Sequence, residues 1–173
     1  MLSVAATRCL NIELDLMRAT WKDLTFLPSD EALSSLYDAW SWFLPKPFRP
    51  VMASALGDVF FQGDGDSVYW LNTGTAEITQ VAASRAEFLE LLNTDLANEW
   101  FMPGLIEQLM SAGKTLKPDY CYTFVTLPVF KEGKYELANL NPVPAKEHFG
   151  VTGLIHREIK DLKLGDKVQI KVV

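Results

Sequence analysis

Two short runs rich in aromatic and β-branched residues, 58–62 and 67–72, constrain the fold most strongly. They are joined by Gly63-Asp64-Gly65-Asp66, a four-residue link with the composition of a tight turn. Two such runs across so short a link can pair only as an antiparallel hairpin. A third run at 77–81 follows another turn, so we expect a three-stranded meander in the middle of the chain.

Helical patterns precede this meander. Apolar residues spaced three and four apart predict a helix over residues 9–24. Apolar and polar residues alternate in its first half, so a strand is the alternative there. The run Pro28-Ser29-Asp30 supplies an N-cap, and a second apolar face after it predicts a helix that ends near Leu44. Prolines at 45, 47 and 50 cannot continue that helix, so we expect a boundary between subregions there.

The rest of the chain alternates helices and strands. Ser84 and Glu87 form a capping-box pattern, and residues 103–113 show a proline start and a glycine stop. We expect strands at 120–125, 135–140 and 167–172. A helix over 145–162 has Val151 and Ile155 on its buried face. The whole predicts an α+β fold with a mostly antiparallel sheet, divided into a helical region 1–50 and an α+β region 51–173, packed as one compact unit.

The charge is unevenly distributed. Residues 51–113 carry nine acids against a single base, Arg85, for a net charge of −8, whereas the whole chain has −6. Phosphate-backbone binding depends on Lys and Arg, so direct nucleic-acid binding is disfavoured and a basic partner is favoured. The alternative is that these acids bind no partner and only keep the exposed faces of helices and a hairpin solvated.

No catalytic constellation stands out. His148 and His156 are eight residues apart on one predicted helix, too far apart to share a metal ion, and we expect both on the surface. Cys121 lies within an aromatic strand and fits a small buried residue better than a nucleophile. The Gly-Asp turn lacks the glutamate that a calcium loop needs at its end. We therefore expect no enzyme activity, no metal and no cofactor.

Several motifs occur in order along the chain: Leu-Gly-Asp-Val-Phe at 56–60, Asn-Thr-Gly-Thr at 72–75, Cys-Tyr-Thr-Phe at 121–124 and Gly-Leu-Ile-His at 153–156. Together they resemble the C-terminal domain of type VI secretion immunity proteins, over roughly residues 56–172. The N-terminal part resembles the GAD-like region that often precedes that domain. These motifs are mainly structural, so they support a shared fold more strongly than a shared partner.

The resemblance implies an antitoxin-like protein of bacteria that sequesters a cognate secreted toxin, often a nuclease, without catalysis of its own. An acidic surface suits the cationic cleft of a nuclease. The exposed acids of the middle region are our candidate contacts: Asp64, Asp66, Glu77, Glu87, Glu90, Asp95 and Glu99. The alternative is a non-catalytic module that binds a peptide or ligand in an aromatic cleft between the subregions.

The compartment is inferred from what the sequence lacks. Two cysteines far apart suit a reducing environment, and no apolar run reaches the roughly 20 residues of a membrane span. The first residues lack both a basic leader and a long apolar stretch. We expect a cytoplasmic protein that does not bind membranes, and the oligomeric state stays open.

Overall fold

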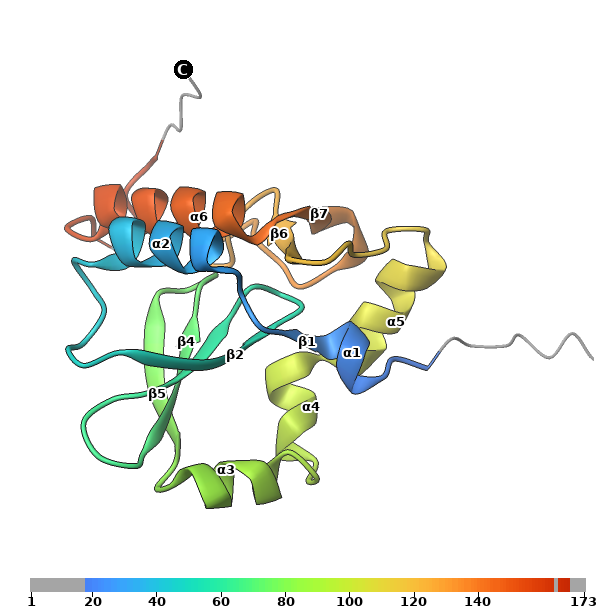
Figure 1. Ribbon diagram of the computed structural model, residues 1–173. Coiled ribbons are helices and arrows are strands. Elements are labelled where there is room, and N and C mark those ends of the chain that lie inside the picture. Colours follow the sequence, from blue (N-terminus) through green and yellow to red (C-terminus); the bar gives the residue numbers. More distant parts are fainter. Residues whose placement is uncertain (1–17, 164, 169–173) are drawn as a thin grey trace, which may run out of the picture.

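A computed structural model describes residues 18–163 and 165–168. Its main feature is a five-stranded antiparallel sheet in the order β1-β2-β3-β4-β5 (Figure 1). The strands are β1 (Thr25–Phe26), β2 (Arg49–Ser54), β3 (Val59–Gln62), β4 (Val68–Asn72) and β5 (Glu77–Ala82). The predicted meander is confirmed as β3, β4 and β5, and the α+β class is confirmed with it.

The sheet is covered on both faces, which explains the continuous apolar run in β3. Val59 and Phe61 point to one side, where they pack with α2 (Asp30–Trp40) and α6 (Ala145–Ile159). Phe60 points to the other side, where it packs with residues of α3, α4 and α5. Side chains alternate between the two faces of a strand, so a strand buried on both faces has to be apolar throughout. Figure 1 shows α2 and α6 above the sheet and α3 below it.

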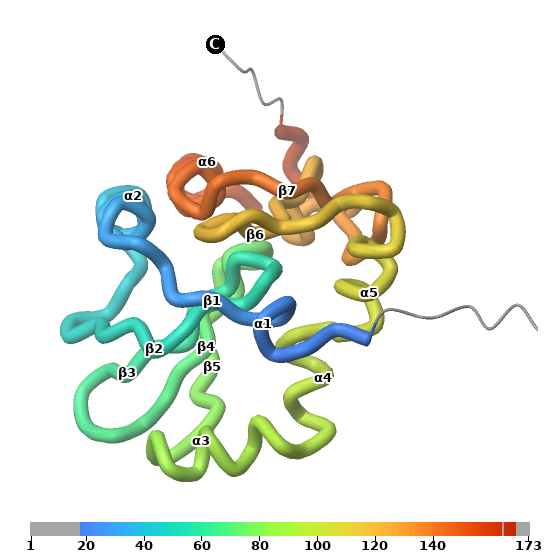
Figure 2. Tube along the Cα trace, turned by 45° about the vertical axis from the view of Figure 1, so that its right-hand side comes forward, coloured from blue at the N-terminus to red at the C-terminus, as the bar shows by residue number. Residues whose placement is uncertain are grey.

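Helices α2 and α6 lie side by side, as both Figure 1 and Figure 2 show. The Ser29 side chain accepts a hydrogen bond from the amide of Ala32, which confirms the predicted N-cap. The helix itself ends at Trp40, and a turn follows through Leu44. A side chain at Gly153 would come within 2.7 Å of Ala39 Cβ, so the absence of a side chain there permits the close approach of the two helices.

Three short helices cover the other face: α3 (Arg85–Leu91), α4 (Leu96–Phe101) and α5 (Pro103–Ser111). Ser84 caps α3 as expected, while Glu87 accepts from the amide of Ala83, one residue before the cap. Pro103 occupies the first turn of α5, and Gly113 follows its end with a φ of +78°. Helix α4 was not predicted, because its six residues are too few to establish a helical period.

A separate two-stranded sheet pairs β6 (Tyr120–Phe124) with β7 (Leu140–Pro144). The expected strand at 135–140 was wrong, since residues 137–139 form the 3₁₀ turn η1 (Leu137–Asn139). Pro142 and Pro144 both lie within β7, although a proline has no amide to donate to a strand pairing. They stand two residues apart, opposite Tyr122 and Tyr120, so both can face away from the ladder, where the missing amide costs nothing.

The ends of the chain differ most from expectation. Most of the helix predicted at 9–24 lies outside the described residues, and its described part contains only α1 (Trp21–Leu24). Strands β1 and β2 were missed, because a two-residue strand has no pattern and β2 begins at Arg49 inside the proline-rich run. Of the strand predicted at 167–172, only Lys167 and Val168 are described, and neither is in a strand. The division at residue 50 stays a prediction.

Candidate functional site

The motifs that carried the family resemblance meet in one buried hydrogen-bonded cluster. Asp58 comes from the turn before β3, Thr73 from the turn after β4, Thr123 from β6, and His148 and His156 from α6. Asp58, His148 and His156 are at most 3% exposed. Motifs far apart in the sequence are therefore neighbours in space, and we call these five residues the polar cluster.

Thr73 is the centre of the polar cluster. Its amide donates to Asp58 Oδ1 at 2.9 Å, and its carbonyl accepts from His156 Nε2 at 3.0 Å. Its hydroxyl lies 2.9 Å from His148 Nε2 and 3.2 Å from Asp58 Oδ1. On the far side of the ring, His148 Nδ1 lies 2.9 Å from the hydroxyl of Thr123. One threonine thus ties the turns of the main sheet to α6, and the His148 ring links both to the small sheet.

Burial sets the charge state of the polar cluster. It raises the pKa of Asp58 from 3.8 to about 7, against the lowering effect of the Thr73 hydrogen bonds and of the nearby Trp70 indole. Burial likewise lowers the pKa of His148 to about 4, and it lowers the pKa of His156. Removing a charge from water costs more than these hydrogen bonds return, so the neutral forms are favoured.

Gly57 makes room for the polar cluster. A Cβ at this position would lie 2.3 Å from His148 Nε2, and the backbone has a φ of +82°, which side chains rarely adopt. The glycine of the Leu-Gly-Asp motif is therefore required twice, for the turn and for the histidine ring that packs on it.

The expectation that both histidines lie on the surface was wrong. The buried face of α6 consists of small and polar residues together with Phe149: Ala145, His148, Phe149, Thr152, Gly153 and His156. Val151, predicted to be on the buried face, is 54% exposed. The apolar period gave the wrong buried face because His148 and His156 find hydrogen-bond partners on other elements, and Thr152 donates to the carbonyl of His148 in its own helix. The spacing of the histidines was the available signal, since eight residues leave both near one face.

The polar cluster suits a structural role rather than catalysis. Its ionisable groups are shielded from solvent, and a general acid or base must be within hydrogen-bond reach of its substrate. Cys121 is buried as expected, and burial raises the pKa of its thiol, which disfavours the thiolate. Among the residues that the structure describes, no group of three His, Cys, Asp or Glu side chains could hold a metal ion.

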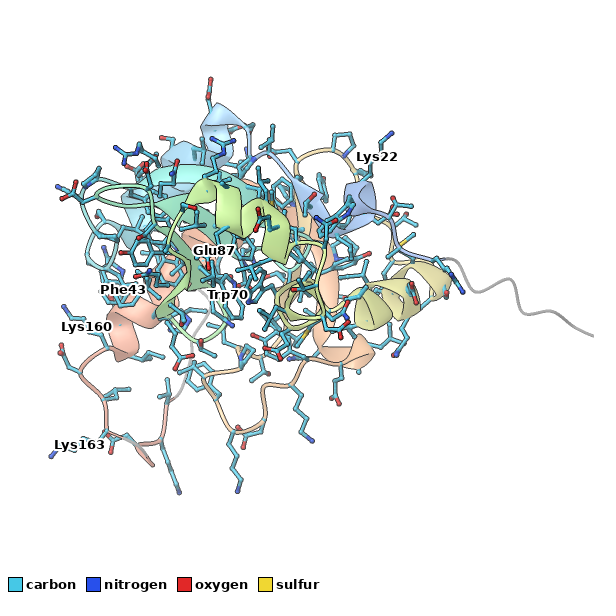
Figure 3. All side chains as sticks on the ribbon, turned by 90° about the horizontal axis from the view of Figure 1, so that it is seen from below. Lys22, Phe43, Trp70, Glu87, Lys160 and Lys163 are labelled. Carbon is cyan, nitrogen blue, oxygen red and sulfur yellow. The ribbon has the colours of Figure 1, made fainter. Side chains whose placement is uncertain are left out.

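All seven candidate acids are exposed, and they fall into two places. Asp64 and Asp66 lie in the β3–β4 turn, at the same end of the sheet as the start of α3, where Ser67 Oγ contacts the carbonyl of Ala83. Glu87 and Glu90 lie on α3 itself, whose outer side faces the viewer in Figure 3.

Asp95 is the N-cap residue of α4 and Glu99 lies within that helix, which follows α3 after a short link. Glu77 stands apart, because it begins β5 and lies about 17 Å along the strand from Ala82. Six of the acids thus lie on the β3–β4 turn, on α3 and at or within α4, and we call these six the acidic end.

A cavity of about 340 Å³ lies where the expected cleft between the subregions would be. Its lining includes Phe26 from β1, Met110 from α5 and Tyr120 from β6. Its lining contains two lysines and two aspartates, so the charged residues around it sum to no net charge: Lys22, Asp23, Lys117 and Asp119. Asp119 is already engaged, since its carboxylate accepts hydrogen bonds from the amide and hydroxyl of Ser29.

Residues 82–156 match the family described as T6SS immunity protein Tdi1, C-terminal. The resemblance to type VI secretion immunity proteins is confirmed over this stretch. It runs from the end of β5 to His156 in α6, and so covers α3, α4, α5, β6, β7 and most of α6. The first half of the chain lies outside the match, so the GAD-like resemblance stays a prediction. No curated protein matches the chain.

The match covers fewer than half of the residues of the chain, and it shows that this stretch is similar to a domain of type VI secretion immunity proteins. Four of the seven candidate acids, Glu87, Glu90, Asp95 and Glu99, lie within the matched stretch. None of the described helices is both long and apolar enough to cross a membrane.

Proposed function

We propose that this protein is a cytoplasmic immunity protein that binds a cognate secreted toxin and has no catalytic activity of its own. The match of residues 82–156 to the immunity family is the observation that carries the proposal. A family of this kind implies a toxin as partner, and sequestration requires binding without chemistry. The shielded polar cluster supports the same view, because it offers no accessible acid, base or nucleophile.

We further propose that the toxin is a nuclease and that the acidic end covers its active-site cleft. A nuclease cleft must be cationic to hold phosphates, and acids at the acidic end can both steer the encounter and occupy the same site. Exposed leucines accompany the acids: Leu89 on α3 is 50% exposed and Leu96 on α4 is 43% exposed. Apolar side chains within a charged surface are typical of protein interfaces, in which an apolar centre lies inside a polar rim. Since bacterial nucleic acid lies in the cytoplasm, immunity against a nuclease belongs there.

Charge reversal at the acidic end tests this proposal. Glu87 is a poor choice, because its carboxylate also accepts from the Ala83 amide at 2.6 Å and its loss would weaken α3. The variant Glu90→Lys changes an exposed acid with no such bond. The matched control is Glu132→Lys, an exposed acid with the same charge change in the loop between β6 and β7.

We expect Glu90→Lys to slow association with the toxin several-fold at low salt and to flatten the salt dependence of the association rate. The control should leave both nearly unchanged. Stopped-flow association at a series of salt concentrations measures these quantities. Equal effects of the two variants would mean that net charge alone matters, and would remove α3 from the interface.

A further inference from the structure

Strand β5 forms one edge of the main sheet. It pairs with β4 on one side, and among residues 18–163 and 165–168 no strand pairs with its other side. Glu77, Thr79 and Gln80 are exposed, and Ile78 is half-buried. An edge of this kind presents a row of unpaired backbone donors and acceptors to any extended chain that comes alongside.

Two hydrogen bonds establish which backbone groups of β5 are open. The Ser54 amide donates to the Asp58 carbonyl at 2.8 Å, so the backbone amide and carbonyl of Asp58 point toward β2. Those of its neighbour Val59 therefore point toward β4. In antiparallel pairs the direction alternates at every residue, so Leu71, opposite Val59, bonds toward β3 and not toward β5. Ile78 lies opposite Leu71, and it must therefore turn its amide and carbonyl to the open side.

The next turn agrees with this assignment. The Ala76 amide donates to the Asn72 carbonyl at 2.9 Å, which directs the Asn72 backbone toward β5. Because the direction of the backbone groups alternates along a strand, those of Leu71 again point toward β3. The backbone groups of Ile78, opposite Leu71, therefore point outward from the sheet. Gln80 has the same parity as Ile78, so β5 offers two outward amides and two outward carbonyls before the register shifts at Val81.

Natural edge strands are usually protected by proline, by lysine or by a bulge. Strand β5 has neither proline nor lysine, and its register is regular from Glu77 through Gln80. The irregularity at Val81 protects only the last two residues. Four consecutive residues are thus available for pairing.

The same edge connects the two groups of candidate acids. Glu77 begins β5, and α3 with Glu87 and Glu90 follows its other end. An extended segment paired along β5 would pass from the first acid to the acidic end. From residue 63 through residue 113 the chain has eight acids and one base, Arg85 at the start of α3, so these elements carry a net negative charge that favours a basic segment.

We propose that the toxin contributes an extended, Lys- or Arg-containing segment that pairs with β5 as an additional strand of the sheet. This is strand addition, in which main-chain hydrogen bonds give affinity and the flanking side chains give specificity. The proposal rests on the immunity function proposed above, because it takes the toxin as the partner. It would place Glu77, which lies apart from the other acids, on the same binding surface as the acidic end.

The variant Gln80→Pro tests the pairing. Proline removes the outward amide and places its ring on the open edge, where strands tolerate it. The matched control, Gln80→Ala, changes the same side chain and keeps the amide. We expect Gln80→Pro to weaken toxin binding about tenfold and Gln80→Ala by less than about twofold, as measured by titration calorimetry. Equal binding by both variants would overturn the proposal while leaving the immunity function intact.

Hydrogen exchange supplies a second measurement that needs no variant. In the free wild-type protein, the amides of Ile78 and Gln80 should exchange freely, and toxin binding should protect both. Protection already present in the free protein would mean that another segment of this chain, or a second copy at higher concentration, occupies the edge, and would overturn the proposal. Failure of the wild-type protein to bind any toxin would instead count against the immunity function itself.

Discussion

The variant Asp58→Asn should change how stability depends on pH, because burial favours the neutral form of the Asp58 carboxyl and raises its pKa. Its pKa rises from 3.8 to about 7 on folding. A group with a raised folded pKa contributes stability that is fully present below the unfolded pKa. That stability is lost as the pH rises through the folded pKa. Asparagine keeps a side-chain oxygen for the two Thr73 hydrogen bonds and does not ionise.

The size of the effect follows from the linkage relation at about 1.4 kcal/mol for each pH unit over which the two states differ by one proton. With pKa values of 3.8 unfolded and about 7 folded, wild type should lose about 2.5 kcal/mol relative to Asp58→Asn between pH 5 and pH 8. The comparison between the two proteins is essential, because His148 shifts in the opposite direction. Its pKa falls to about 4 on folding, so it stabilises the fold as the pH rises toward 6.5.

Urea denaturation of both proteins at a series of pH values measures this difference. The free energy of unfolding of Asp58→Asn should increase steadily relative to that of wild type from pH 5 to pH 8. This change with pH is expected whatever the difference between the two proteins is at pH 5. A constant offset would mean that Asp58 has an ordinary pKa in the folded protein. If the variant instead became less stable relative to wild type as the pH rises, the ionised carboxylate would stabilise the polar cluster, and the reasoning would be refuted.

Two glycine substitutions test the packing directly. Gly57→Ala places a methyl group 2.3 Å from His148 Nε2 at a φ of +82°, and should cost about 2–4 kcal/mol of unfolding free energy. Gly153→Ala brings a methyl group within 2.7 Å of Ala39 Cβ and should cost about 1–3 kcal/mol by forcing α2 and α6 apart. Gly104→Ala is the control for both, since nothing lies within 4 Å of its added Cβ. Thermal denaturation measures the stability of all three variants, and wild-type stability in all of them would contradict this account.

The sequence predicted the parts of the fold whose pattern is local. The hairpin, the cap at Ser29 and the proline start of α5 were each signalled by residues within a few positions of one another. Strand β7 was misplaced because two prolines look like breakers unless their partner strand is known. Their compatibility with the ladder depends on the partner residues Tyr120 and Tyr122, which lie 20 or more residues earlier in the sequence.

The polar cluster could not be predicted for a similar reason. His148 looks like a surface residue until Thr73 and Thr123 are known to reach it from two different sheets. The candidate acids were correctly expected to be exposed, because charged side chains seldom bury. Their division into Glu77 and the acidic end depends on the length and direction of β5, which composition does not reveal.

Titration of this protein into the purified product of the gene next to its own, the candidate toxin, tests the central claim most directly. Binding heat and the nuclease activity of the toxin should be followed in the same series of additions. We predict a one-to-one complex with a Kd in the nanomolar range or below, equivalent to about −12 kcal/mol, and loss of cleavage in proportion to the protein added. A folded, active toxin that neither binds nor loses activity at micromolar concentrations of this protein would contradict the proposed function.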